Sequence, residues 1–453
     1  MEVTETLQRT EPAQAWRPHL TPAHEQLAPR LEAFYRDLHS HPELSMQEGQ
    51  TAAKVARWLE RCGYEVTPGV GRHGVVGVLR NGPGPTVLLR ADMDALPVEE
   101  KTGRADASHV RVKDSGGGTV PVMHACGHDV HVTCLLGVAE LLATARHHWR
   151  GTLMMVAQPA EETLEGARAM LRDRLYERFG KPDVALAQHV GPLEVGFIGH
   201  HRGASMMASA NVRVRIFGKG GHGSEPHLAV DPVVIAAYLV TRLQTIVSRE
   251  VDLAAGGAVI SVGSLHAGSR SNIIPDEAVL EMTVRTPTDA LQKQVLDAIS
   301  RMAKAECDAG RAPKPPEIEV MSRTRVMVND DSYFTRVRSA HAAWFGEEHI
   351  VDTGMLSGSE DFPYFDGRTS GEGARPAEVP LVYWNFGGTS HEAWKRAPGK
   401  TFLEKLQSLP SNHSPLFDPS LDSLRFGCES MLLAALACLD EEPRAQPPSR
   451  GVH

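Results

Sequence analysis

The sequence predicts an α/β protein in which a smaller α+β domain is inserted into a larger one. The chain has 453 residues, which is too many for one compact core. Up to about residue 200, continuously apolar strands alternate with helical segments, as in a sheet that helices cover on both faces. Residues 206–316 instead follow the order β-α-β-β-α-β, which is that of a ferredoxin-like sandwich.

The first part of the larger domain, residues 22–205, is predicted to open with helices over about 26–38 and 49–62. The runs GVVGVLR, PTVLLRA, GTLMMVAQ and DVALAQ are apolar on both faces, which is typical of strands in a covered sheet. Between the second and third of these strands, HDVHVTCLLGVAELLATA predicts a helix. ARAMLRDRLY predicts a shorter helix after the third strand.

The insert, residues 206–316, carries its own helix and strand signals. NVRVRIFGKG alternates as a strand, and AVISVGSL, AVLEMTVRT and PPEIEVMS are further strands. Asp231 and Pro232 mark a helix start, because Asp is a favoured N-cap and Pro fits the first turn. LQKQVLDAISRMAKAE predicts the second helix. In AVLEMTVRT, Arg285 and Glu281 share the polar face of the strand.

The second part of the larger domain is predicted to span residues 317–440. It contains SYFTRVRSAHAAWF, VPLVYWNFGG and SLRFGCESMLLAALACL, which read as helix, strand and helix. The segments 1–21 and 441–453 are polar or rich in proline, and we expect both to be loosely ordered tails.

Composition argues against several classes of protein. Lys and Arg number 47 against 56 Asp and Glu, and the net charge of -9 disfavours a general nucleic-acid binder. No apolar run approaches the roughly 20 residues that span a bilayer, so we expect no membrane association. The N-terminal segment shows no secretory signal, and six cysteines in so long a chain form no disulfide framework. We therefore expect a cytoplasmic protein.

Residue types that bind metals follow the apolar strands at their downstream ends. Asp92 and Asp94 follow PTVLLRA, Glu161 and Glu162 follow GTLMMVAQ, and His189 follows DVALAQ. Ligands of open α/β sheets bind beyond the carboxyl ends of the strands. Carboxylates and imidazoles are ligands of first-row metals, and carboxylates at strand ends rarely help packing. The pattern therefore predicts a metal site at this edge of the sheet.

The segment MHACGHDVH (123–131) opens a helix between the first two of these strands and adds Cys126 and His128. Each residue also has a purely structural explanation. A lone cysteine is usually a small buried hydrophobe, a histidine can bond the backbone at a helix start, and Glu161 and Glu162 could occupy a helix N-terminus. Because all of them gather at successive strand ends, the metal interpretation is favoured over these alternatives.

Short motifs from about residue 30 to 435 carry a family resemblance. They are HPELSMQE, RADMDALPVEE, MHACGHDVH, QPAEE, GKGGHGSEPH, SNIIPDEA, SGSEDF and NHSPLF. Together they resemble the M20 metallopeptidase family, and within it the amidohydrolase branch of aminoacylases, hippurate hydrolases and auxin-conjugate hydrolases. The resemblance implies a zinc-aminopeptidase-like α/β catalytic domain with an inserted ferredoxin-like lid through which two subunits dimerise.

The resemblance also implies a metal-ligand set, which comprises Cys126, His128, Glu162, His189 and His413. Such a set suits two divalent ions per subunit, with the Cys126 thiolate as the bridging group. A thiolate favours zinc, whereas carboxylate and imidazole also accept manganese or cobalt. Other branches of the family have His-x-Asp at 92–94, so their first ligand is absent here and we expect His128 to replace it.

Catalytic and substrate-binding residues follow from the same resemblance. Glu161 is the expected general base, and Asp94 is expected to orient a metal ligand. His222 of the lid would reach the partner subunit's site and stabilise an oxyanion, although alone it could be an ordinary loop histidine. The residues expected to bind the substrate carboxylate are Asn272, Arg285 and Gly358. A surface ion pair of Arg285 with Glu281 is the alternative for that arginine.

The predicted activity is hydrolysis of the amide bond of small N-acyl-L-amino acids. A dipeptidase or an N-acetyl-diaminopimelate-type deacetylase is the alternative within the hydrolases. A non-catalytic metal-binding dimer would be expected to lack Glu161 or a ligand, and a redox or structural-zinc role would need paired cysteines. Two polar or Gly/Pro-rich loops, 106–121 and 366–380, would either reshape substrate entry or be tolerated surface insertions.

Overall fold

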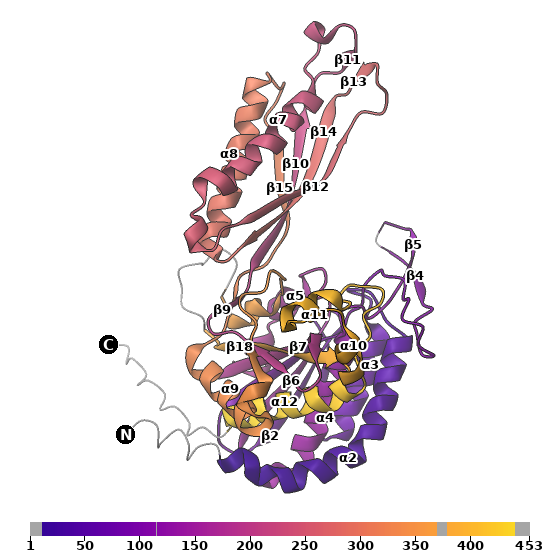
Figure 1. The fold of residues 1–453 in the computed structure, drawn as a ribbon, viewed down its shortest axis with the longest axis vertical. Coiled ribbons are helices and arrows are strands. Elements are labelled where there is room, and N and C mark those ends of the chain that lie inside the picture. The colour runs from indigo at the N-terminus through magenta and orange to yellow at the C-terminus, as the bar shows by residue number, and fades with distance from the viewer. Residues whose placement is uncertain (1–10, 115, 369–377, 440–453) are drawn as a thin grey trace, which may run out of the picture.

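The computed structural model describes residues 11–114, 116–368 and 378–439. Figure 1 shows a larger body built on one sheet and a narrower body that projects from it. The narrower body is the four-stranded sheet with its two long helices, and it is formed by the middle of the chain. The predicted fold class, an α/β domain with an inserted ferredoxin-like α+β domain, is confirmed.

The larger body is built on an eight-stranded mixed sheet with the order β1-β2-β6-β3-β7-β18-β8-β17. The four central strands β6, β3, β7 and β18 run parallel to one another, so their carboxyl ends meet at one edge of the sheet. The bounds of the eight strands are β1 Glu65–Val70, β2 Gly74–Asn81, β3 Thr86–Asp92, β6 Gly151–Gln158, β7 Val184–Glu194, β8 Ile198–His200, β17 Ile350–Asp352 and β18 Leu381–Thr389.

Helices cover both faces of this sheet, which is why its central strands are apolar at nearly every position. On one face lie α2 Glu11–Ser40, α3 Gly49–Arg61, α4 His128–Thr144, α9 Asp331–Phe345 and α12 Asp422–Leu439. On the other face lie the shorter helices α5 Gly166–Arg172 and α6 Leu175–Phe179 and the 3-10 turn η6 Phe362–Asp366.

Two helices differ from the sequence prediction. Helix α2 already includes Glu11, the first described residue, whereas the predicted helix started near residue 26, so residues 11–21 of the expected loose tail are helical; 1–10 and 440–453 lie outside the described residues. The predicted helix ARAMLRDRLY is divided into α5 and α6, because Arg174 adopts a left-handed conformation with φ 61°.

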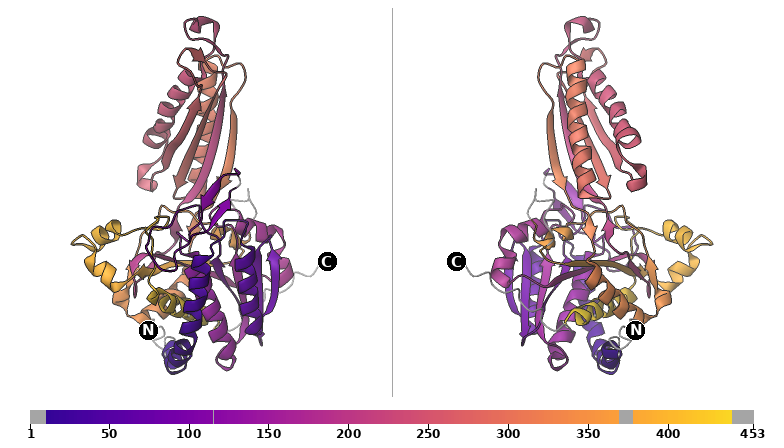
Figure 2. Two further views of the ribbon diagram at one scale, coloured as in Figure 1. Left: turned by 90° about the vertical axis from the view of Figure 1, so that its right-hand side faces the viewer. Right: turned by 90° about the vertical axis from the view of Figure 1, so that its left-hand side faces the viewer.

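The projecting body has the strand order β12-β14-β10-β15, and all its neighbouring strands are antiparallel. Helices α7 and α8 pack on one face of this sheet (Figure 2). The inward side chains alternate along the strands, so that Leu280, Met282 and Val284 are buried in β14. The bounds are β10 Ala208–Phe217, α7 Pro232–Thr245, β12 Val259–Ala267, β14 Glu277–Thr286, α8 Asp289–Ala309 and β15 Glu317–Arg323.

The last strand shows that the expected end of the insert at residue 316 is too early. β15 pairs with β10 from Glu317 to Arg323, so these residues belong to the sheet of the insert. A second small sheet, β11 Gly221–His222 with β13 Ile273–Ile274, lies at the end of the insert that is farthest from the larger body (Figure 1). We call the whole unit, residues 208–323, the lid.

Short elements complete the fold. β9 Ala204–Met206 pairs with β16 Met327–Val328 where the chain passes between the two bodies. β4 Arg111–Lys113 and β5 Thr119–Pro121 form a hairpin within loop 106–121. Helices α10 His391–Arg396 and α11 Phe402–Ser408 follow β18. Within the described parts of the chain, no helix has the length and apolar character that crossing a membrane requires.

Candidate metal centre

The parallel strands place the predicted site residues at one edge of the large sheet. Asp92 is the last residue of β3, Glu161 and Glu162 follow the end of β6, and His189 is the middle residue of β7. Helix α4 begins at His128, directly after Gly127, whose left-handed φ of 82° turns the chain at this point. The parallel pairing of these strands therefore gathers the carboxylates and imidazoles at a single edge.

The five predicted metal ligands lie together in the structure. Cys126 Sγ is 3.4 Å from His189 Nε2. His128 Nε2 is 3.9 Å from Glu162 Oε1, which is 3.4 Å from His413 Nε2. Potential ligand atoms in the triads Cys126–His128–His189 and Cys126–Glu162–His413 lie within 4.8 Å of one another. Cys126 and Glu162 thus link all five side chains in one cluster.

Unsatisfied polar atoms show that this cluster suits cations. His128 Nδ1 donates a hydrogen bond to the main-chain carbonyl of Asp94 at 2.8 Å, so His128 Nε2 is the nitrogen that faces the other ligands. His128 Nε2 and Glu162 Oε1 are both buried, and neither has a hydrogen-bond partner among the described residues. Buried polar groups without partners are costly in a folded protein. A divalent cation would satisfy both atoms.

The charges around the cluster also favour the binding of cations. Burial lowers the pKa of His128, but the carboxylates of Asp92 and Asp94 raise it to about 10, so positive charge is favoured at this position. Burial raises the pKa of the Cys126 thiol well above its usual value, and the Glu162 carboxylate raises it further. A thiolate therefore needs a positive charge beside it, which bound metal ions supply.

Glu161, the predicted general base, lies against this cluster. Its Oε2 is 4.0 Å from His128 Nε2, and the residue is only 6% exposed. Burial raises the pKa of Glu161 well above its usual value, and the carboxylates of Glu360 and Glu162 raise it further. Cations at the neighbouring ligands act in the opposite direction, because they favour the carboxylate form.

Asp94 contacts more of the site than was predicted. Its carboxylate oxygens accept hydrogen bonds from the main-chain N–H groups of Glu161 at 3.1 Å and Glu162 at 2.9 Å. The hydroxyl of Ser45 donates to the same carboxylate at 2.6 Å. His128 contacts Asp94 chiefly through the main-chain carbonyl, since the side-chain oxygen is 3.4 Å away. Asp94 therefore holds both the turn that carries the glutamates and the first residue of α4.

The sequence prediction missed a buried network behind the cluster. The guanidinium of Arg90, in the middle of β3, pairs with Asp92 at 2.6 Å and with Glu360 at 2.7 Å. Arg90 Nε also donates to Gln158 at 2.9 Å, and Arg90 Nη2 lies 3.2 Å from Asp361. One available signal was an arginine inside the otherwise apolar run PTVLLRA, because a buried guanidinium requires acidic partners.

His131 was also missed. It lies three residues after His128, on the same side of α4, and is completely buried. Its Nδ1 is 2.5 Å from Asp92 Oδ1, while Asp92 Oδ2 is bound by Arg90. Both oxygens of Asp92 are therefore engaged by protein groups. The helical spacing of the two histidines in CGHDVH was the available signal.

The lid residues are divided between two places. His222 and Asn272 lie near each other, since the N–H of Gly223 donates to the carbonyl of Asn272 at 2.8 Å. Figure 1 shows that β11, which carries His222, lies at the end of the lid far from the large sheet. Within one chain, the structure therefore does not bring His222 or Asn272 to the ligand cluster.

Arg285 lies at the other end of the lid, paired in the sheet with Ser209 near the connection to the larger body. Glu281 forms an ion pair with Arg213 at 2.8 Å, so the alternative that pairs Glu281 with Arg285 is wrong. Arg285 Nη1 is buried, and it finds no hydrogen-bond partner in the parts of the chain that are described. Burial lowers the pKa of Arg285, and no carboxylate of the described residues opposes this effect.

Gly358 lies between β17 and η6, where a Cβ atom would come within 3.1 Å of the Met206 side chain. Glu360 lies two residues after Gly358, and its carboxylate lies within 4.8 Å of that of Glu161.

Of loop 366–380, residues 369–377 lie outside the described residues. The hairpin of loop 106–121 borders a groove of about 160 Å³ that is also lined by His41, Glu43 and Leu44 of the HPEL motif.

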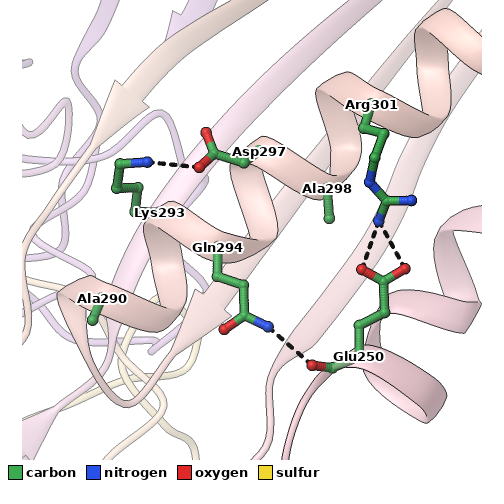
Figure 3. Close-up of a pocket in the computed structure, with 7 residues that line it drawn as sticks. All are labelled: Glu250, Ala290, Lys293, Gln294, Asp297, Ala298 and Arg301. Atoms are coloured by element: carbon green, nitrogen blue, oxygen red, sulfur yellow. Dashed lines mark hydrogen bonds and ion pairs between the residues drawn. The ribbon is translucent and has the colours of Figure 1, made fainter.

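A larger groove, of about 450 Å³, lies away from this cluster, between α8 and the segment ending at Glu250 on the lid (Figure 3). Its charged side chains are already paired, Arg301 with Glu250 at 2.6 Å and Lys293 with Asp297 at 2.7 Å. None of the predicted site residues lines it. We therefore place the candidate site at the ligand cluster and not at this groove.

Comparisons with known proteins agree with the geometry. A family profile described as Peptidase family M20/M25/M40 matches residues 88–393. The hippurate hydrolase of Campylobacter jejuni subsp. jejuni is 37% identical over 342 residues, which cover 74% of this chain and 84% of that protein. The IAA-amino acid hydrolase ILR1-like 2 of Arabidopsis thaliana is 32% identical over 418 residues, covering 90% and 84% of the two chains.

A solved structure shows the same architecture. The Bacillus subtilis protein YXEP, described as a dinuclear metal-binding peptidase of the M20 family, superposes with a TM-score of 0.71 at 27% identity. The match covers 92% of this chain and 99% of that one. Profile, relatives and structure agree, and the chain belongs to peptidase family M20/M25/M40.

Proposed function

We propose that this protein is a metal-dependent amidohydrolase that cleaves N-acyl-L-amino acids into a carboxylic acid and a free amino acid. The observation that carries the proposal is the buried carboxylate of Glu161 beside a cluster of five potential metal ligands. Relatives named hippurate hydrolase and IAA-amino acid hydrolase support this substrate class. The family supports hydrolysis as the type of reaction.

The residues that would hold two divalent ions are Cys126, His128, Glu162, His189 and His413. The thiolate favours zinc over manganese or cobalt. Divalent ions held there supply polarisation of the amide carbonyl and activation of water near neutral pH. The description of the related YXEP structure as dinuclear supports a pair of ions.

Glu161 moves the protons of the reaction. Its carboxylate accepts one proton from the attacking water as the C–O bond forms, and it later gives that proton to the amide nitrogen as the C–N bond breaks. Asp94 keeps Glu161 in place, because its carboxylate holds the main-chain N–H of that residue.

The lid would hold the amino-acid end of the substrate. Arg285 is suited to bind the free carboxylate, because one of its buried nitrogens has no partner in the described structure. Asn272 and Gly358 are proposed to approach the same carboxylate group. Asn272 lies at the end of the lid far from the large sheet of its own chain, so this assignment requires the lid to contact the site of another subunit.

A homodimer formed through the lid would meet this requirement. Helix α7 exposes Val234 and Tyr238, which are 50% and 64% exposed, and edge strand β12 exposes Val259 and Leu265. In the described chain, β12 has a neighbouring strand on one side only. A second lid could cover this apolar surface and extend the sheet, and it would carry His222 toward the partner subunit's site.

We also propose a cytoplasmic location, because the six cysteines all lie in described segments and none of them forms a disulfide. Cys134 and Cys428 do pack together between α4 and α12, where the Cys428 thiol lies 3.6 Å from the carbonyl oxygen of Cys134. They lie apart from the ligand cluster, whose only cysteine is Cys126.

A substrate panel combined with metal analysis tests the proposed function. N-acetyl, N-benzoyl and long-chain N-acyl amino acids should be hydrolysed, and a chelator should abolish the activity. Dipeptides should be poor substrates, and a preference for them would instead support a dipeptidase. Failure to hydrolyse any N-acyl amino acid while two ions are bound would contradict the proposal.

Glu161→Gln tests the base. We expect kcat to fall by about 10²- to 10⁴-fold while the metal content stays the same, because a glutamine cannot accept the proton. Glu165→Gln is the matched control, since Glu165 is exposed and follows in the same segment. Steady-state kinetics and metal analysis of both variants provide the readouts. Nearly full activity of Glu161→Gln would exclude Glu161 as the base.

A further inference from the structure

The main chain of Val190 is bound on both sides by side chains of the metal centre. Val190 follows the predicted ligand His189 on β7. Its N–H donates to His131 Nε2 at 2.8 Å. Its carbonyl accepts hydrogen bonds from His189 Nδ1 at 2.7 Å and from the side-chain amide of Asn412 at 3.1 Å. Three side chains from separate segments therefore meet at this one residue.

The hydrogen bonds of His131 fix its tautomer and orientation. Because His131 Nε2 accepts from Val190, its proton is on Nδ1, which donates to Asp92 at 2.5 Å. Arg90 in turn holds the other oxygen of Asp92 at 2.6 Å. The His131 ring also packs edge-on against the ring of His189, with centroids 4.4 Å apart. His131 thus supports His189 both through the main chain and by direct contact.

Asn412 connects the remaining ligand-bearing segments. Its side-chain amide donates to the carbonyl of Cys126 at 3.1 Å, as well as to that of Val190. Asn412 directly precedes His413, whose own N–H donates to the carbonyl of Ala125 at 2.8 Å. The segments that carry Cys126, His189 and His413 are therefore tied together by one amide group.

The side chain of Val190 completes the arrangement. A Cβ atom added to Gly127 would come within 2.3 Å of Val190 Cγ1, so only glycine leaves room for the valine. Gly127 lies between Cys126 and His128 and has a left-handed φ of 82°. Val190 is therefore in close contact with the turn that carries two further ligands.

We propose that His131 and Asn412 are positioning residues of the metal centre, which act by holding Val190. They hold the imidazole of His189 and the segments of Cys126 and His413 in place before the ions bind. Metal binding therefore costs less conformational entropy. Groups that hydrogen-bond to metal ligands commonly change metal affinity when they are removed. This inference rests on the proposed ligand set and is independent of the substrate.

Variants that remove the hydrogen bonds of one side chain at a time test the inference. His131→Asn retains a donor for Asp92 but is too short to accept from Val190, whereas the carbonyl of His131→Gln can reach the Val190 N–H. Asn412→Ala removes both bonds to the main-chain carbonyls. His341→Leu is the control, because His341 is equally buried but bonds to His200 and the Ser430 carbonyl, away from the centre.

Zinc affinity of the metal-free variants, measured by competition with a chelator, is the main readout. We expect His131→Asn and Asn412→Ala to weaken binding of at least one ion by about 10- to 100-fold, with a smaller loss in His131→Gln. The cobalt–thiolate absorption band should change in the first two variants. His341→Leu should lower the melting temperature and leave zinc affinity unchanged.

Two outcomes would overturn the inference. A further variant, Cys126→Ala, shows whether the proposed ligand set is itself wrong. Unchanged zinc affinity in both His131→Asn and Asn412→Ala would refute it, as would an equal loss in His341→Leu. If His131→Asn does not fold, Asn412→Ala decides, because its side chain is only partly buried. If Cys126→Ala binds zinc as the unaltered protein does, the ligand set itself is wrong.

Discussion

At the scale of single residues, Arg285 is the cation best placed to define the substrate. Its neighbour Glu281 is already paired with Arg213, and one guanidinium nitrogen of Arg285 is buried without a partner in the described structure. Burial lowers its pKa, which means that its charge is poorly compensated by the protein. A substrate carboxylate would supply the missing countercharge and could accept two parallel hydrogen bonds.

Arg285→Ala should therefore raise KM for N-acyl amino acids while hardly affecting their carboxamides. A charge-assisted hydrogen bond of about 1.5–3 kcal/mol corresponds to a loss in kcat/KM of about 10- to 100-fold. The kcat/KM of Arg285→Lys for N-acyl amino acids should lie between those of the unaltered protein and Arg285→Ala. Lysine keeps the charge but lacks the planar guanidinium group that can donate two parallel hydrogen bonds. Kinetics with matched acid and amide substrates provide the measurement. Equal losses for acid and amide would argue against carboxylate recognition.

The residues of the site differ in how far the sequence could predict them. Cys126, His128 and Glu162 were predicted because metal-binding residue types recur at strand ends and within recognisable motifs. Arg90 was missed, because its partner Glu360 lies 270 residues away and only the folded chain brings them together. The role of Val190 is also invisible in the sequence, because it acts through main-chain groups that every residue other than proline possesses.

At the scale of elements, a buried histidine joins the end of α2 to the start of α4. His39 contacts Asp129 at 2.7 Å and Glu100 at 3.2 Å, and all three side chains are buried. Burial lowers the pKa of His39, but hydrogen bonds to Asp129 and Glu100 raise it from 6.5 to about 9. A raised pKa means that the folded protein binds this proton more tightly than the unfolded chain does.

The contribution of His39 to stability should consequently depend on pH. It is fully present below about pH 6.5, where the unfolded chain is also protonated, and it is lost as the pH rises through about 9. The shift corresponds to about 3 kcal/mol at most, since one pKa unit is about 1.4 kcal/mol. The melting-temperature difference between the unaltered protein and His39→Gln should therefore shrink from pH 6 to pH 9.5.

The melting curves are best recorded on metal-free protein, so that loss of ions does not contribute. His109→Gln is a suitable control, because His109 is exposed in the neighbouring loop. A difference between the unaltered protein and His39→Gln that stays constant across this pH range would show that His39 is not held as a charged group.

Most elements could be predicted from periodicity, and the exceptions have local causes. β6 and β7 are apolar on both faces because helices cover both sides of the sheet. The break between α5 and α6 was not predicted, because the left-handed φ of Arg174 follows no residue preference. The end of the lid was placed too early, at residue 316, although the strand PPEIEVMS had been assigned to the insert; the pairing of β15 with β10 extends the lid to Arg323.

At the scale of the whole molecule, the lid and the metal centre are too far apart in one chain to act together through His222. Figures 1 and 2 show the lid as an elongated body that projects away from the large sheet. β11, with His222, lies at its outer end, whereas the ligand cluster lies at the edge of the large sheet. If His222 stabilises an oxyanion, the site that it serves belongs to another subunit.

Complementation between two inactive variants tests this arrangement. Glu161→Gln lacks the base but keeps His222, while His222→Ala keeps the base and lacks the lid histidine. In a hybrid dimer, the site with Glu161 receives His222 from the other subunit, so an equal mixture should regain about one quarter of the full activity if subunits exchange freely. If His222 instead serves its own site, every site in the hybrid lacks one group and no activity returns. Native mass spectrometry of differently tagged variants would establish that hybrids form. Formation of hybrids without any return of activity would therefore rule out catalysis across the dimer.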